Sequence, residues 1–230
     1  MPTPLIHLLC VAALWAVPMT AGAQQAPAAP AAPTSASSDL LKQAFPNARV
    51  QRNLDGSPGL VVGLNVQIQG KTLEDKVKAF VTSWGQALGL EHVSLQVVGT
   101  PQKMGATHVV RLSQMHGPMA VFQRMATVTF NAKGHIIAWH ANTLPVRQTT
   151  KGPVTDQQAI AHAAASLYGP KADSKVKGAR VLARVLWADP TQAVEAWLVQ
   201  LPRTSTLLAP RVLVRTTDGA ILSTHDAAKR

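Results

Sequence analysis

A regular alternation of apolar and polar residues, interrupted twice by a helical pattern, constrains the fold of this chain most strongly. Residues 60–68 carry an apolar side chain at every second position, which predicts a strand with one buried face. From Thr72 the apolar spacing changes to three and four residues, which predicts a helix that ends near Gly89. Period-two runs then return and predict further strands at residues 95–97, 110–112, 122–130 and 136–141, with a tight turn at 131–134.

A second unit repeats this plan after a polar break that contains two prolines, at residues 144–153. Thr155 and Gln158 have the spacing of a helix capping box, and Gly169-Pro170 stops the helix that they begin. Four more strands are predicted, at residues 181–187, 194–201, 211–216 and 221–224. The order of elements therefore predicts an α+β fold of two consecutive modules, each with one helix packed on an antiparallel sheet, at residues 48–145 and 153–226.

The first 23 residues resemble a secretory signal peptide. Leu5 to Val17 is almost unbroken apolar sequence, and Ala21-Gly22-Ala23 forms a small-x-small cleavage site. The apolar run is shorter than the roughly 20 residues that a membrane-spanning helix needs, so no membrane span is expected. Residues 24–47, rich in Ala and Pro at their start, are expected to form a linker. We therefore expect an exported protein that is periplasmic or extracellular.

The residues that would support catalysis are missing from the sequence pattern. Cys10, the only cysteine, falls within the expected signal peptide, so a mature chain would have no thiolate nucleophile or ligand. No His-Glu-x-x-His, Gly-x-Ser-x-Gly or glycine-rich phosphate loop occurs. The 11 carboxylates stand mostly at turns and helix starts. The sequence thus predicts a protein that is not an enzyme and holds no cofactor or metal. A catalytic group of residues that come together only in the folded chain is the alternative that the sequence leaves open.

A spaced pattern runs through the first module. The residues of this pattern are, in order, Arg111, Leu112, Ser113, Gln114, Met119, Val121, Phe122, Val128, Asn131 and Gly134. This pattern resembles the fungalysin/thermolysin propeptide (FTP) module, which has Arg-x-x-Gln, Gly-Ile-Pro-Val, a strand and Asp-x-x-Gly. Three positions depart from it: Gly117 falls one residue early, Ala120 replaces proline and Asn131 replaces aspartate.

The second module has a pattern of its own. It comprises the helix start at residues 154–159, the strand Ala196-Trp197-Leu198-Val199 and the hairpin at residues 218–222. This order resembles a PepSY module. In proteins that carry both modules, the pair precedes a secreted zinc metallopeptidase, helps it to fold and keeps it inactive. The resemblance implies a non-catalytic protein that binds, and inhibits or chaperones, a secreted zinc metallopeptidase.

The resemblance also suggests which residues would meet such a partner, through strand addition or insertion of an extended tail. The interface candidates are Gln114, Val121, Phe122, His225 and Asp226. His225 or Asp226 would approach the zinc of a partner, although a frayed terminus is the alternative interpretation of the tail. Gln114 has an alternative role too, namely to satisfy buried backbone groups.

The formal net charge of +11 leaves a second class of function open. A field of this sign favours acidic partners, so the chain is alternatively a basic envelope module that binds an anionic polysaccharide or lipid surface. Nucleic acid is disfavoured because no aromatic residues are interleaved with the basic ones. A third interpretation is the N-terminal prosegment of a longer protease precursor. The sequence leaves the oligomeric state open.

Overall fold

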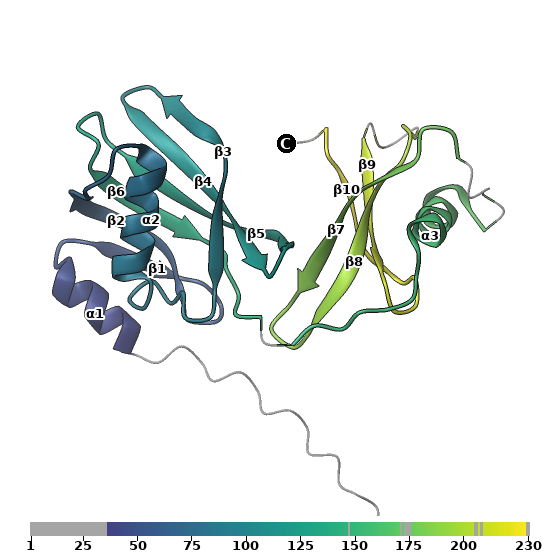
Figure 1. Cartoon of the computed structure of the whole chain (residues 1–230), viewed down its shortest axis with the longest axis horizontal. Helices are drawn as coiled ribbons and strands as arrows, with labels where there is room; N and C mark the ends of the chain where they lie inside the picture. Colours follow the sequence, from purple (N-terminus) through teal and green to yellow (C-terminus); the bar gives the residue numbers. More distant parts are fainter. Residues whose placement is uncertain are drawn as a thin grey trace, which may run out of the picture.

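The computed structural model describes residues 36–228, with the exception of residues 147, 171, 173–175, 205–206 and 208. The expected signal peptide and the first part of the expected linker, residues 24–35, lie outside the described residues. The described part of the chain has three helices and ten strands, and Figure 1 shows them in two halves that lie side by side.

The first half is a six-stranded antiparallel sheet. Neighbouring strands follow the order β1-β2-β6-β5-β4-β3. Their bounds are β1 Arg49–Arg52, β2 Pro58–Val66, β3 Ser94–Met104, β4 Thr107–His116, β5 Met119–Phe130 and β6 Ile136–Ala141. The turn expected at residues 131–134 joins β5 to β6, and Gly134 has the left-handed φ of 76° that such a turn favours.

Helix α2, Leu73–Trp84, covers one face of this sheet (Figure 1). It begins as the sequence predicts, because the Thr72 hydroxyl accepts from the Asp75 N–H and the Asp75 carboxylate accepts from the Thr72 N–H. Val77 and Phe80 on its inner side are fully buried, and the Phe80 ring lies 6.2 Å from the ring of Trp139 on β6. These contacts form the larger of the hydrophobic cores.

Helix α1, Ala36–Ala44, precedes this sheet and falls within the range expected to be a linker. Leu41 is fully buried in the same core as Phe80. Just beyond the helix, the ring centroid of Phe45 lies 4.7 Å from that of Trp84 at the end of α2. The helix is therefore attached to the first half by apolar side chains.

The second half is a four-stranded antiparallel sheet with one helix on its outer face. The strands follow one another in chain order, namely β7 Arg180–Ala188, β8 Ala193–Gln200, β9 Pro210–Arg215 and β10 Ile221–Asp226. Helix α3, Asp156–Tyr168, has the predicted capping box of Thr155 and Gln158. Its buried residues Ala159 and Ala163 are small, so the helix lies close against Val199, Val212 and Val214.

The prediction of two separate modules, each one helix on its own sheet, is wrong. Val121 of β5 pairs in parallel with Leu186 of β7, and this bridge joins the two halves into one ten-stranded sheet. The described part of the chain is mainly β-structure in one curled sheet with a helix packed on each half, and not a pair of separate α+β units. Figure 1 shows the β4–β5 end of the first half reaching toward β7.

An irregularity in β5 explains this junction. Between the paired positions Ser113↔Met125 and Met115↔Ala120, β4 has the single residue Gln114 while β5 has four, residues 121–124. This bulge carries Val121 away from β4 and toward β7. Gln123 within it has a left-handed φ of 57°. Asn142 holds the bulge, since its side chain accepts from the Met125 N–H at 2.8 Å and donates to the Gln123 carbonyl at 2.9 Å.

Candidate binding site

Gln114, the first interface candidate from the sequence, is 1% exposed and lies beneath the bulge. Its side-chain nitrogen donates to the carbonyl of Leu144, and its side-chain oxygen accepts from the Leu144 N–H at 2.9 Å. Leu144 belongs to the segment that leads from β6 toward the second half. The alternative role stated above, satisfaction of buried backbone groups, is the one that this geometry displays.

Val121, Phe122 and His225 meet at the junction between the halves. Val121 is 1% exposed and packs in a cluster with Leu144 and Leu186. Phe122 packs over the face of the second sheet opposite α3, and its ring lies 5.6 Å from that of His225 on β10. These three residues, like Gln114, thus contribute to contacts inside the chain, and their predicted contact with a partner stays a prediction.

Asp226, the fifth candidate, ends β10. Its carboxylate oxygen Oδ1 accepts from the N–H of Ala209 at 2.9 Å and from that of Ala228 at 3.1 Å. The bond from Ala209 holds the end of β10 against the segment that enters β9. Lys229 and Arg230 of the predicted insertion tail lie outside the described residues.

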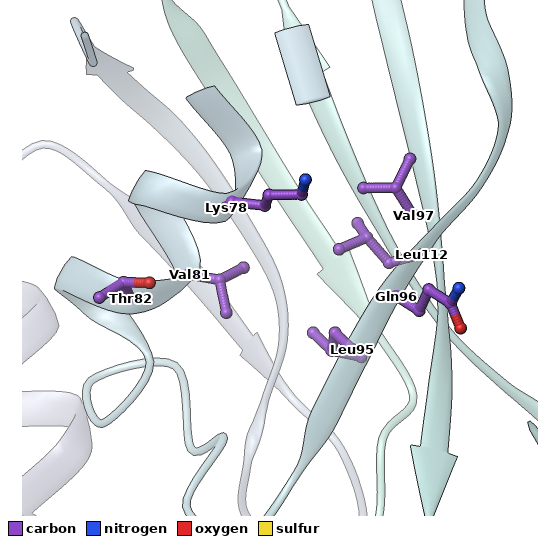
Figure 2. Close-up of a pocket in the computed structure, with 7 residues that line it drawn as sticks. All are labelled: Lys78, Val81, Thr82, Leu95, Gln96, Val97 and Leu112. Carbon is purple, nitrogen blue, oxygen red and sulfur yellow. The ribbon is translucent and has the colours of Figure 1, made fainter. Parts of the chain in front are cut away.

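An apolar groove, which the sequence analysis did not anticipate, lies between α2 and strand β3. It encloses about 250 Å³. Figure 2 shows its lining: three side chains from α2, three from β3 and one from β4, namely Lys78, Val81, Thr82, Leu95, Gln96, Val97 and Leu112. The groove exists because α2 lies over the middle of the sheet and leaves the inner face of β3 only partly covered, so that Leu95 and Val97 stay half-buried.

Strand β3 is an edge of the sheet, because in the described part of the chain it pairs only with β4. Its two ends differ. After Val98 the pairing with β4 is interrupted by a bulge that contains Gly99, with a φ of 69°, and Pro101, and Lys103 follows. Proline, lysine and bulges are the features by which proteins protect a sheet edge from unwanted pairing. Residues 94–98, beside the groove, have none of them.

The electrostatics of the groove are simple. Lys78 is the only charged residue of its lining, and no carboxylate lines it. The ion pairs found among the described residues are Arg184–Glu195 and Arg215–Asp218, so the Lys78 ammonium has no acidic partner there. Lys78 is exposed at the rim. The site therefore offers an apolar floor, an open strand edge and one available positive charge.

The sequence held a signal for this site. Lys78 has the helical phase of a water-facing residue, and Leu95 and Val97 have the period of ordinary core strand residues. Pro101 within the same strand is the informative residue, because proline in a strand indicates an edge. Local pattern cannot tell how far a helix covers the sheet beneath it, so the groove itself required the structure.

Within the described ranges the structure brings together no group of three His, Cys, Asp or Glu side chains that could hold a metal ion. The same part of the chain has no helix with the length and apolar character needed to cross a membrane. The clearest perturbed acid lies in the β9–β10 turn. There the hydrogen bonds from Arg215, at 2.8 and 2.7 Å, and from the Ala220 N–H lower the pKa of Asp218 below its ordinary value.

Comparisons with known proteins give little for this chain. No model of a known protein family matches it, and no curated protein matches it. Among solved structures, the C-terminal domain of Bacillus megaterium YpeB is similar, with a TM-score of 0.37 and 13% sequence identity. The match covers 77% of this chain and 75% of that one. This similarity assigns no family, so the resemblance to FTP and PepSY modules stays a prediction.

Proposed function

We propose that this chain is a non-catalytic binding protein that captures an extended segment of another protein by adding it as a strand to β3. The observation that carries the proposal is the open edge at residues 94–98, which lies directly beside the groove under α2. Extended peptides bind to sheet edges in this way: the backbone hydrogen bonds provide affinity, and pockets for alternate side chains provide specificity.

The groove also defines the chemistry of the guest segment. Its floor, formed by Leu95, Val97 and Leu112, accepts apolar side chains from alternate positions of the added strand. Lys78 at the rim favours a guest with an acidic residue next to those positions. The bulge after Val98 ends the flat part of the edge, so the guest pairs over about five residues.

The partner that we propose is a secreted zinc metallopeptidase, as the resemblance to the FTP and PepSY modules implies. Addition of an extended segment to a sheet edge is a common way for one protein to bind another, so an open strand edge suits this role. The chain would then act as an inhibitor or folding chaperone outside the cytoplasm.

Selection of binding peptides from a displayed library of random sequences tests the strand-addition step. We expect the selected peptides to share alternating apolar residues and an acidic residue. Thr82→Trp fills the groove from its rim and should weaken binding of a selected peptide at least about tenfold, which corresponds to about 1.4 kcal/mol. Ser83→Trp is the matched control, because Ser83 is an equally exposed neighbour on α2 that does not line the groove. Equal loss in both variants, or no loss in either, would rule out the groove.

The identity of the partner is tested separately. We expect the full chain, used as bait against secreted proteins, to recover a zinc metallopeptidase and to slow its hydrolysis of peptides. Thr82→Trp should abolish both effects, and Ser83→Trp should preserve them. Recovery of a protein of another class through the same groove would keep the strand-addition mechanism and replace the partner.

A further inference from the structure

The face of the first sheet opposite α2, here called the uncovered face, has no helix packed on it in the described part of the chain. The strand registers define which residues share it, since side chains alternate between faces. One row crosses all six strands, in the order Gln51, Leu60, His140, Thr127, Arg111 and Val98. A second row begins with Arg49 paired to Val62.

The charges on the uncovered face are all of one sign. Strands β1–β6 contain no Asp or Glu, so nothing on this face balances Arg49 and Arg111. Both arginines and His140 are exposed. Asp55, the acid nearest to Arg49 in sequence, lies in the connection between β1 and β2, where its carboxylate accepts from the N–H and the hydroxyl of Ser57. Asp75 lies in the first turn of α2, which packs on the opposite face. Adjacent strands are about 4.8 Å apart, so the cations from Arg49 on β1 to Arg111 on β4 are spread over about 19 Å.

Apolar side chains lie among and beside these cations. Val62, Val98 and Met125 are 36%, 37% and 40% exposed, although residues of these types are usually buried. No Phe, Tyr or Trp belongs to the rows of the uncovered face, whose one ring side chain is His140. The surface therefore combines positive charge, hydroxyl groups and exposed aliphatic carbon.

This combination selects among possible occupants. A second copy of the chain would place arginines against arginines without any acid between them. Single-stranded nucleic acids stack their bases on the rings of Phe, Tyr and Trp, which this face does not have. An anionic bilayer surface meets all three features: its lipid phosphates pair with arginine and threonine, and its acyl boundary accepts valine and methionine. The geometry points to the uncovered face as a docking surface for an anionic phospholipid bilayer.

Docking through this face leaves the β3 groove accessible, because the groove lies on the α2 side of the same sheet. The chain would then hold its guest segment at a membrane surface. The inference is independent of the proposed function, because it uses the other face of the sheet and shares only Val98 with the strand edge.

Co-sedimentation of the full chain with lipid vesicles tests the inference. We expect the chain to bind vesicles of phosphatidylcholine mixed with phosphatidylglycerol and to leave pure phosphatidylcholine vesicles unbound. The double variant Arg49→Glu, Arg111→Glu should lose at least about tenfold in partitioning, because each basic residue contributes appreciably near an anionic surface. The control Lys151→Glu, Lys177→Glu changes the net charge equally at exposed positions outside the strands and should bind almost as the wild type.

Two further arms keep the result interpretable. Met125→Ser removes aliphatic surface without a change of charge, and it should lower vesicle binding about threefold while the melting temperature stays near that of wild type. Arg49→Gln, Arg111→Gln replaces the glutamate pair if that pair fails to fold. Equal loss in the lysine control would show attraction by net charge alone and overturn the inference. Soluble polyglutamate provides the last comparison. If the chain binds it as strongly as it binds vesicles, and Met125→Ser does not change that binding, the partner is an acidic polymer and the inference is overturned as well.

Discussion

The side-chain amide of Gln114 makes the two hydrogen bonds to the backbone of Leu144 that a neighbouring strand would otherwise make. It donates to the Leu144 carbonyl and accepts from the Leu144 N–H, with Gln114 1% exposed and Leu144 8% exposed. These bonds are necessary because the bulge moves β5 away from the position where it would pair with the Leu144 N–H and carbonyl. Gln114, which the sequence suggested as a contact for a partner, thus holds the segment that connects the two halves.

Gln114→Ala should therefore destabilise the chain strongly. The substitution leaves a buried N–H and a buried carbonyl without partners, and each such group costs about 1–3 kcal/mol. We expect the free energy of unfolding, measured by denaturant titration, to fall by about 3 kcal/mol. Gln102→Ala, at an exposed position on β3, should change it little. A loss in Gln114→Ala no greater than in this control would contradict the role given to the amide.

Phe122→Ala should loosen the second half from the first. Phe122 is half-buried against the second sheet and contacts His225, so its removal should cost about 2 kcal/mol. Hydrogen exchange followed by mass spectrometry should show faster exchange in β7–β10 than in β1–β6. Met125→Ala, on the same strand but exposed, serves as the control. Uniform exchange in both halves would mean that this contact does not couple them.

Gly152→Ala should be destabilising for a steric reason. A Cβ atom at this position would lie 2.1 Å from the carbonyl oxygen of Thr216 and 2.2 Å from the Cα of Thr217, so backbone would have to move. We expect a loss of about 2–3 kcal/mol in thermal or denaturant unfolding. Gly117→Ala is the comparison: its Cβ would contact nothing within 4 Å, and only its left-handed φ of 55° opposes the change. That variant should lose about 1 kcal/mol, and a reversed order would show that the connection near Gly152 adjusts freely.

Arg215→Gln should raise the pKa of Asp218. The hydrogen bonds from Arg215 are the largest cause of its lowered pKa, and the Ala220 N–H keeps a smaller part of the effect. A carboxylate with a lowered folded-state pKa stabilises the fold above its unfolded pKa, and this contribution disappears as the pH falls through the folded pKa. Titration of the Asp218 carboxyl carbon by NMR should show the midpoint moving upward in the variant. An unchanged midpoint would assign the shift to the turn backbone alone.

Local sequence was sufficient for most of the elements, with α1 and β1 as exceptions, but not for their assembly. The capping boxes at Thr72 and Thr155 and the turn glycine Gly134 give their own geometry, because the groups that bond lie within four residues of one another. Val121 and Leu186 are distant in sequence and each fits the pattern of an ordinary strand, so nothing local indicates that they pair. The joined sheet therefore could not be predicted from the periodicity of apolar residues alone.

The candidate site shows the same division. Pro101 indicates from the sequence that its strand, β3, lies at an edge of the sheet. The groove, however, depends on where α2 lies across the sheet. Leu41 makes a similar case for α1: two adjacent leucines in a short segment of otherwise small and polar residues give no periodic signal, although Leu41 is fully buried. Sparse apolar anchors of this kind become recognisable only once the surface that they contact is known.

The bulge and proline in the second part of β3 have a consequence for self-association. An edge that was flat throughout would accept copies of the same sheet, each of which would present a new edge for the next, and this is how fibrils grow. With regular pairing confined to residues 94–98, the proposed guest strand would find a short edge on β3, while the edge of another copy would find no template that matches its full length. A protein that offers its backbone to partners can in this way stay dispersed at high concentration.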